Sequence, residues 1–307
     1  MSKSINRRRF LQTASSAGAL AAATLGASQS ALAAPAKKFQ KGISPFPLCL
    51  NTSTIRPASL KDKIKVAADA GYDAIELWMN DLEEYEKAGG NVKDLGKEIK
   101  DRGLFVPDCI GLWDDMPPTE EEFKASLPAT RNRMRLAADA GSQHVAALPL
   151  HRDLLNMGRK DFNIICAMEF VSLFNTIPRL GQACAIAIDA NDKDACIVAD
   201  TFHLHNGGSG FEGIRHLNGS LIAVFHWSDV GPEPAPGNMH DGDRIYPGDG
   251  ILPLKSAIQQ LAEINYTGCL SLELFNAKHY EIAKTDPLQI AKTGLEKMRA
   301  CVQSALG

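Results

Sequence analysis

The sequence predicts a (β/α)8 TIM barrel behind a short N-terminal export signal. The chain has 307 residues, 45% hydrophobic and 22% charged, which is the composition of an ordinary globular protein. Apolar segments with strand character alternate with segments of helical spacing, and eight of these segments are strand candidates. Repeated strand–helix units are typical of a parallel sheet covered by helices, and eight units in this length fit a closed barrel.

Residues 1–33 are predicted to be a cleavable export signal. They contain no acidic residue, and the arginines at 7–9 precede Phe10 and a weakly apolar Ala/Gly/Ser run. Ala31 and Ala33 supply small residues for cleavage after Ala33. The paired arginines resemble a twin-arginine (Tat) signal, which implies the Tat export machinery and a periplasmic location. A plain Sec signal or a basic amphipathic helix is the alternative, and the run is too polar for a stable membrane anchor.

The charge and the cysteines exclude several classes of protein. Cleavage after Ala33 removes four basic residues and no acidic one, so the net charge falls from −3 to −7. Such a chain offers no basic field to a polyanion, and we expect no nucleic-acid partner. The seven cysteines are scattered without a CxxC pair, which favours buried reduced thiols over a zinc motif.

Residues 34–45 are predicted to be a linker and residues 46–307 the barrel domain. The strand candidates are 46–55, 73–78, 104–113, 145–150, 164–170, 196–205, 221–229 and 269–275. Helical spacing is found in 60–70, 92–102, 119–141, 177–188, 253–264 and 287–305. Thr119 precedes three glutamates, which is typical of a capped helix start.

The fourth and fifth strand candidates lie unusually close in the sequence. About a dozen residues separate them, and a helical crossover usually needs that many for the helix and its turns together. The helix between strands 4 and 5 is therefore predicted to be short or missing. A doubly wound sheet is the alternative fold, although no GxGxxG or P-loop motif follows a strand.

Four strand candidates carry a metal-competent side chain near their carboxyl ends, where barrel enzymes place their chemistry. These residues are Glu169, Asp200, His226 and Glu273. A carboxylate in an apolar strand is costly to bury unless it is paired or bound to a cation. Singly, each has an ordinary explanation as a rim salt bridge or a core histidine. Together they predict one divalent ion, with Mn²⁺ favoured and Mg²⁺, Co²⁺ or Zn²⁺ as alternatives.

Several short motifs carry a family resemblance. They are GYDAIELW at 71–78, AMEF at 167–170, DTFHLH at 200–205, FHWSD at 225–229, RIYPGDG at 244–250 and LSLELFN at 270–276. With these motifs in this order, the sequence resembles the sugar phosphate isomerase/epimerase superfamily, the xylose isomerase-like TIM barrels. That group includes ketose 3-epimerases, hydroxypyruvate isomerase and the inosose dehydratases. The resemblance extends over residues 47–306.

The resemblance implies roles for individual residues. It implies that the four strand-end residues hold one divalent metal, and that Glu169 and Glu273 also act as catalytic proton carriers. It implies that His203 and Arg244 contact substrate oxygens. An ion that ligates a carbonyl and its neighbouring hydroxyl lowers the energy of an enediolate. A carboxylate removes the proton next to the carbonyl, and its return gives an epimer or an isomer.

Other polar residues near strand ends have open assignments. Glu76 is predicted either to bind substrate or to form a rim salt bridge. Asp229 is expected to orient His226 or the loop that follows it. Trp78, Trp113 and Trp227 either wall the sugar pocket or pack in the core. The Gly/Pro-rich stretch 231–250, which contains His240, is expected to form a mobile loop over the site.

The function predicted from the sequence is therefore a divalent-metal-dependent isomerase or epimerase acting on a small sugar or polyol. An inosose-dehydratase-like lyase and a non-catalytic exported sugar-binding protein are the alternatives. An endonuclease IV-like nuclease is disfavoured, because the chain has eight histidines and an acidic charge. The sequence leaves the substrate and the oligomeric state open.

Overall fold

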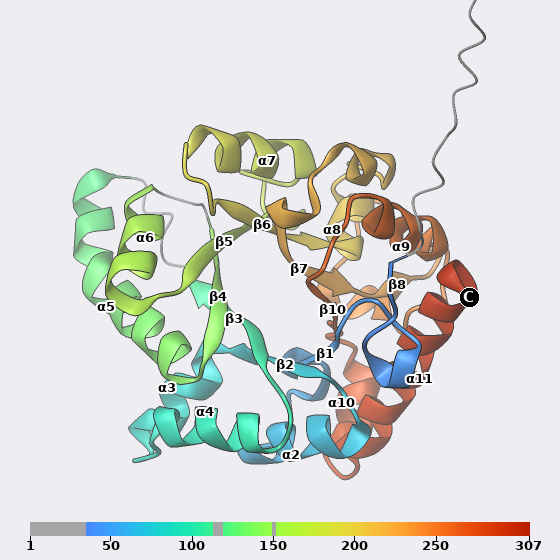
Figure 1. Cartoon of the computed structure of the whole chain (residues 1–307), viewed down its shortest axis with the longest axis horizontal. Helices are drawn as coiled ribbons and strands as arrows, with labels where there is room; N and C mark the ends of the chain where they lie inside the picture. Colours follow the sequence, from blue (N-terminus) through green and yellow to red (C-terminus); the bar gives the residue numbers. More distant parts are fainter. Residues whose placement is uncertain (1–34, 113–118, 149–151) are drawn as a thin grey trace, which may run out of the picture. The chain divides into compact units, whose positions relative to one another are not determined.

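Eight parallel strands form a closed barrel at the centre of the domain (Figure 1). The structure is a computed structural model that describes residues 35–112, 119–148 and 152–307. Its barrel strands are β1 (Leu48–Asn51), β2 (Ala74–Trp78), β3 (Val106–Leu112), β4 (Ser142–Ala147), β5 (Ile165–Glu169), β6 (Cys196–Asp200), β7 (Ile222–Trp227) and β10 (Cys269–Leu272). The predicted export signal and Trp113 lie outside the described residues.

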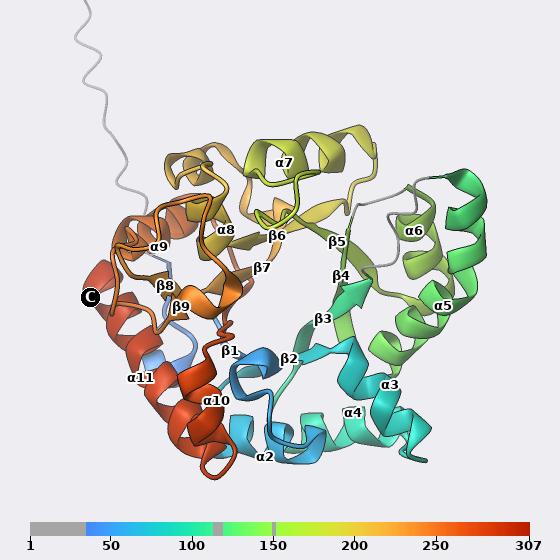
Figure 2. The same cartoon turned by 180° about the vertical axis from the view of Figure 1, so that it is seen from behind.

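Strand order follows the sequence around the ring, and β10 closes it against β1. The helices lie outside the strands, as both views show (Figures 1 and 2). They are α2 (Leu60–Ala70), α3 (Met79–Lys87), α4 (Val92–Asp101), α5 (Glu120–Asp139), α6 (Arg152–Met157), α7 (Leu180–Asp189), α8 (Thr201–Asn206), α9 (Leu254–Glu263), α10 (Ala277–Ala283) and α11 (Pro287–Leu306). The predicted TIM barrel is confirmed, since seven of the eight strand candidates contain a whole barrel strand and the fourth, 145–150, overlaps the end of β4.

The connection between β4 and β5 is short, as predicted. It holds α6, of six residues, and a π-helical turn over Gly158–Phe162. Leu154 and Leu155 of α6 are fully buried, so this brief helix still covers the barrel wall beside β5.

Two strand candidates extend too far in the prediction. The sixth strand ends at Asp200, because the Asp200 carboxylate accepts hydrogen bonds from the backbone N–H of Phe202 (2.5 Å) and His203 (3.1 Å). This cap starts helix α8, so His203 lies on a helix and not on a strand. The first strand likewise ends at Asn51, whose side-chain oxygen accepts a hydrogen bond from the backbone N–H of Ser53. Helices α3, α8 and α10 were not predicted.

Part of the predicted linker packs against the start of the barrel. The Gln40 side chain donates hydrogen bonds to the carbonyl of Gly71 (3.1 Å) and to the carboxylate of Asp73 (2.6 Å). Its oxygen accepts a hydrogen bond from Arg299 of α11 (2.8 Å). These contacts join the beginning of the described chain to its last helix.

The interior of the barrel is apolar near its middle and polar toward the carboxyl ends of the strands. Small and branched side chains fill the middle, namely Ile110, Ala146, Ala167, Cys196 and Val198. All seven cysteines are free thiols, and only Cys301 is partly exposed. Among the described residues, no helix is both long enough and apolar enough to span a membrane.

Two helical glycines should respond in opposite ways to alanine. A Cβ on Gly96 of α4 would lie 2.7 Å from the backbone oxygen of Asp139, whereas a Cβ on Gly181 of α7 would meet nothing within 4 Å. Helix propensity alone favours alanine at both positions. We therefore expect Gly96→Ala to lower the free energy of unfolding by about 1–3 kcal/mol, because the backbone must shift.

Gly181→Ala should leave the stability unchanged or raise it slightly. Urea denaturation midpoints measure both variants. Equal midpoints for the two variants would contradict the close packing of α4 against α5.

Candidate metal centre

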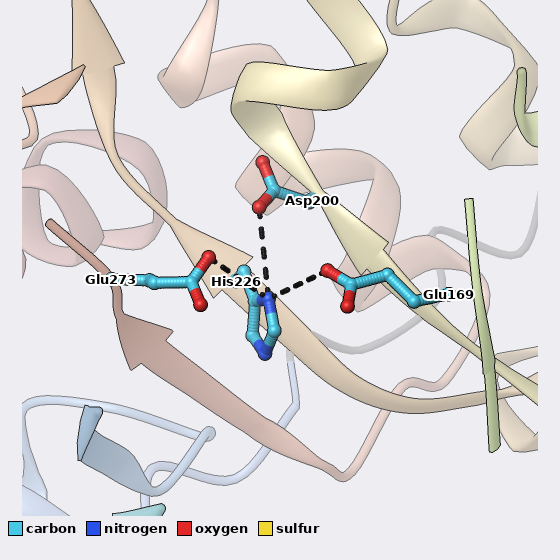
Figure 3. A group of neighbouring side chains, drawn as sticks. All are labelled: Glu169, Asp200, His226 and Glu273. Atoms are coloured by element: carbon cyan, nitrogen blue, oxygen red, sulfur yellow. Dashed lines mark ion pairs between the residues drawn. The ribbon is translucent and has the colours of Figure 1, made fainter. Parts of the chain in front are cut away.

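Four side chains from neighbouring strands converge at the carboxyl end of the barrel (Figure 3). Glu169 ends β5, Asp200 ends β6, His226 lies on β7, and Glu273 follows β10 directly. One possible ligand atom from each lies within 4.8 Å of the others, and all four residues are buried. The structure therefore brings together the quartet that the sequence predicts.

The His226 ring nitrogen Nδ1 is the centre of this group. It lies 3.2 Å from Glu169 Oε1, 3.2 Å from Glu273 Oε2 and 3.6 Å from Asp200 Oδ2. This buried nitrogen makes no hydrogen bond within the part of the chain that the structure describes. Buried polar atoms are almost always partnered. A nitrogen lone pair and three carboxylates around one point fit a divalent cation, with Mn²⁺, Co²⁺ and Zn²⁺ all compatible with this donor set.

Glu76 supports His226 from the opposite side of the ring. Glu76 Oε1 lies 2.9 Å from His226 Nε2. The other Glu76 oxygen accepts hydrogen bonds from Asn51 (2.8 Å) and Ser271 (2.6 Å). A carboxylate at Nε2 keeps the proton there and leaves Nδ1 free as a ligand, which is the usual arrangement around metal-binding histidines.

The structure gives Glu76 a role that was not predicted from the sequence. It is fully buried outside the pocket lining and contacts His226, Asn51 and Ser271, which favours support of His226 over a rim salt bridge. The physical reason is its place in β2, whose side chains alternate between the barrel interior and the helices. Glu76 faces the interior two residues before β2 ends. The pocket begins at Trp78, the last residue of the strand.

The charges of the site are strongly coupled. Burial by itself lowers the pKa of His226, but Glu273, Glu76 and Glu169 raise it well above its usual range. Burial raises the pKa of Glu273 to about 7, against the lowering effects of His226 and Arg244. So many carboxylates in a buried space need positive charge, which a cation at Nδ1 would supply.

Arg244 is fixed in place beside the quartet. Its guanidinium donates a hydrogen bond to Asp200 Oδ2 (2.7 Å), and it lies 3.3 Å from Glu273 Oε2. A third contact joins it to Asp241 (3.2 Å), and its carbon Cζ lies 4.4 Å from the centroid of the Phe202 ring. Arg244 is therefore a preorganised cation at the edge of the site.

A pocket of about 300 Å³ opens above these groups. Its charged and polar lining is Glu169, His203, Asp241, Arg244 and Glu273. Its walls are largely apolar and include Trp78, Phe174 and Phe275. The predicted substrate-contacting residues His203 and Arg244 thus line the pocket, and so does Trp78. Trp227 is fully buried and lines the core instead.

Six lining residues were not identified from the sequence, namely Asp241, Phe275 and the apolar Ile110, Val171, Leu173 and Phe174. Phe275 follows Glu273 by two residues, and this alternation along a strand end was a usable signal. Asp241 had no such signal, because it lies in the long stretch 231–250 and reaches the pocket only through that stretch's fold.

The stretch 231–250 reaches the site through a small antiparallel ladder between β8 (Asp229–Val230) and β9 (Arg244–Ile245). Asp229 holds the far end of this stretch. Its carboxylate accepts hydrogen bonds from the backbone N–H groups of Gly248 (3.0 Å), Gly250 (3.0 Å) and Leu252 (2.9 Å). Of the two expectations for Asp229, the structure favours support of the loop over contact with His226.

Comparison with known proteins agrees with this geometry. A family model described as xylose isomerase-like TIM barrel matches residues 156–301. An inosose isomerase from Bacillus velezensis is 26% identical over 81% of this chain and 95% of its own length. A D-psicose 3-epimerase from Agrobacterium fabrum is 21% identical over 69% of this chain and 78% of its own length. These matches support the xylose isomerase-like TIM barrel superfamily.

Solved structures of other proteins share this fold. The crystal structure of the IOLI protein with a bound zinc atom aligns with a TM-score of 0.76 and 24% identity, covering 84% of this chain and 99% of that one. A structure of L-ribulose 3-epimerase aligns with a TM-score of 0.65 and 20% identity, covering 84% of this chain and 95% of that one. At these identities the structural likeness establishes the fold.

The Glu76 carboxylate should be needed for tight metal binding even though it is not a ligand. We expect Glu76→Gln to weaken binding of Zn²⁺ or Co²⁺ about 10- to 100-fold, because the neutral amide makes Nδ1 a poorer donor. Isothermal titration calorimetry of the metal-stripped protein measures this. Glu281→Gln, which alters an exposed carboxylate paired with Lys284, is the matched control. Unchanged affinity in Glu76→Gln would contradict the role given to Glu76.

Proposed function

We propose that this chain is a divalent-metal-dependent isomerase or epimerase acting on a small sugar or polyol. The observation that carries the proposal is the pocket floor, where two buried glutamates of the metal quartet, Glu169 and Glu273, also face the space for a substrate. The relatives named above include an isomerase and an epimerase of sugar-like substrates, and they support an enzyme of this general kind.

The metal would be held by the quartet Glu169, Asp200, His226 and Glu273. When bound, a divalent cation supplies Lewis-acid stabilisation of negative charge that develops on substrate oxygens. We favour Mn²⁺ because three of the four donors are carboxylates. The zinc atom in the related IOLI structure makes Zn²⁺ the main competitor.

The two pocket glutamates are placed for proton transfer on different sides of a substrate. Figure 3 shows Glu169 and Glu273 on opposite sides of His226. One carboxylate removes the proton from the carbon next to the carbonyl. The other returns a proton to the opposite face, which gives an epimer, or the proton is returned to the neighbouring carbon, which gives an isomer.

Other residues of the pocket orient the substrate. Arg244 offers a fixed guanidinium to hydroxyl or carbonyl oxygens, and His203 lies beside it on the pocket wall. The Trp78 and Phe275 rings stand edge to face, with their centroids 5.8 Å apart, and they cover one side of the pocket. Such a wall suits the C–H face of a sugar ring and excludes water from the reacting carbon.

A dehydratase is the second candidate. A 3-dehydroshikimate dehydratase from Pseudomonas aeruginosa is 23% identical over 71% of this chain, which covers 36% of that protein. The same proton abstraction followed by loss of a hydroxyl from the next carbon would give such a lyase. The products separate the two candidates, since one reaction yields a stereoisomer or isomer and the other releases water.

We also propose that the barrel domain (46–307) is exported, with a signal at 1–33 and a linker beginning at residue 34. The support is the acid-free N-terminus with its arginines at 7–9. Fractionated cells should contain a periplasmic protein beginning at Ala34. Replacing the three arginines with lysine should retain the precursor in the cytoplasm. A mature wild-type protein found only in the cytoplasm would refute export.

The catalytic proposal predicts exchange of a substrate hydrogen with solvent. Mn²⁺-loaded protein incubated in D₂O with a panel of ketoses and inososes should introduce deuterium next to the carbonyl of its substrate. Glu273→Gln should slow this exchange at least about 100-fold, because it removes one proton carrier. Mass spectrometry measures the exchange, and Glu281→Gln is again the control. Sugar binding without exchange or water release would favour the non-catalytic binding protein.

A further inference from the structure

A chain of hydrogen bonds joins the stretch 231–250 to the ring of His203. The Asn206 side-chain oxygen accepts hydrogen bonds from the backbone N–H of Gly237 (2.7 Å) and Met239 (3.3 Å). The Asn206 amide nitrogen donates to the hydroxyl of Ser172 (3.0 Å). That hydroxyl lies 2.9 Å from His203 Nδ1. His203 and Asn206 are 4% and 5% exposed, so water does not replace these contacts easily.

The direction of every bond in this chain is fixed by chemistry. Because the Asn206 oxygen receives two backbone N–H groups, the other end of its amide must be the donor. The Ser172 oxygen accepts from that donor, and its own hydrogen is then available to His203 Nδ1. The backbone N–H of Ser172 also points at Nδ1, at 3.3 Å. A backbone N–H can only donate, so this contact requires Nδ1 to be an acceptor, and the serine hydroxyl then donates to the same nitrogen.

A neutral His203 with an accepting Nδ1 must carry its hydrogen on Nε2. An imidazolium would carry a hydrogen on both ring nitrogens, so an accepting Nδ1 also means that the ring is neutral. The Nε2 atom lies on the pocket side, 3.4 Å from an Arg244 nitrogen that also donates to Asp241. Arg244 could donate to Nε2 only in the other tautomer, and its contact is the longest of the three around the ring. In that tautomer, however, the hydrogen on Nδ1 would face the backbone N–H of Ser172.

We propose that Ser172 and Asn206 are positioning residues that hold His203 as its Nε2–H tautomer, so that it donates a hydrogen bond to a substrate oxygen. The hydrogen bond to a substrate oxygen rests on the proposed function, whereas the tautomer does not. In the proposed reaction, removal of the proton next to the carbonyl places negative charge on the carbonyl oxygen, and a fixed neutral donor would stabilise that charge without a change of protonation. Such a donor complements Arg244, whose guanidinium is already engaged by three carboxylates.

The proposal also links the loop to the chemistry. The amide of Asn206 is oriented by backbone N–H groups at 237 and 239, and the same stretch carries Asp241 and Arg244 into the pocket. Folding of this stretch therefore places the Arg244 guanidinium in the pocket and at the same time sets which nitrogen of His203 carries the hydrogen. No residue of 237–239 needs to touch the substrate for this to occur.

Nitrogen NMR tests the tautomer without any substrate. The probe is protein labelled with ¹⁵N-histidine and loaded with diamagnetic Zn²⁺, and long-range ¹H–¹⁵N spectra distinguish protonated from bare ring nitrogens. His144 provides an internal reference, because its Nδ1 lies 3.0 Å from the carbonyl oxygen of Pro107 and must be protonated. We expect opposite tautomers for His203 and His144. His203→Gln and His144→Gln assign the signals, and an Nδ1–H tautomer or an imidazolium at His203 would overturn the proposal.

Two variants test the relay itself. Asn206→Asp keeps the acceptor for the loop but cannot donate to Ser172, so the serine hydroxyl turns toward Asp and Nδ1 of His203 should become protonated. Ser172→Ala removes the hydroxyl but retains the backbone N–H at Nδ1, so the Nε2–H tautomer should persist. An unchanged His203 spectrum in Asn206→Asp would refute the relay.

Activity completes the test once a substrate is found by deuterium exchange. We expect Asn206→Asp to reduce kcat about 10-fold or more while its Zn²⁺ affinity stays within about twofold of wild type, because the metal quartet is untouched. Ser172→Ala, in which the Nε2–H tautomer should persist, is expected to retain most of the activity that Asn206→Asp loses. Equal loss of kcat and of metal affinity in Asn206→Asp would indicate a merely structural role. The expected spectra from a protein that exchanges no hydrogen would refute the proposed function and leave the tautomer assignment standing.

Discussion

The hydrogen bond between His226 and Glu76 is the contact on which the rest of the site depends. It fixes the orientation of the imidazole, so that Nδ1 faces the three carboxylates of the quartet. Without it, the ring could present a hydrogen to Glu169 and Glu273, and the quartet would become an ordinary ion-pair cluster. Glu76 is in turn fixed by Asn51 of β1 and Ser271 of β10, so the two strands that follow each other on one side of β2 contribute to the orientation of one ring.

Around this contact the site has two layers, one suited to a cation and one suited to a substrate. The buried layer below Nδ1 supplies negative charge for a cation, and the pocket above it supplies apolar walls and a few fixed donors. Arg244 joins the layers, since it touches Asp200 and Glu273 and also lines the pocket. The substrate is thus recognised by a small number of rigid polar groups on one side of a largely apolar space, which is the usual construction of a small-molecule site.

The barrel and the metal quartet could be predicted from the sequence, because each barrel strand is a short apolar run and several of these runs end in a polar residue. Glu169, Asp200, His226 and Glu273 were all identified from that pattern. Glu76 has the same pattern and a different role, because its place in the interior is set by strand register, which single-strand periodicity does not give. The relay through Ser172 and Asn206 was also beyond prediction, since it joins three segments that meet only in the folded chain.

The closure of the barrel has a consequence for how the centre is assembled during synthesis. All neighbouring strands are consecutive in the chain except β1 and β10, whose pairing joins the two ends of the domain and is reinforced by the bonds of Gln40 to Asp73 and Arg299. Such a distant contact forms only after a large loss of chain entropy. Glu273 follows β10, so a nascent chain that ends before residue 273 holds at most three of the four ligands, and β10 cannot yet close the barrel. The metal centre is therefore finished together with the barrel, and an incomplete chain cannot present the full site.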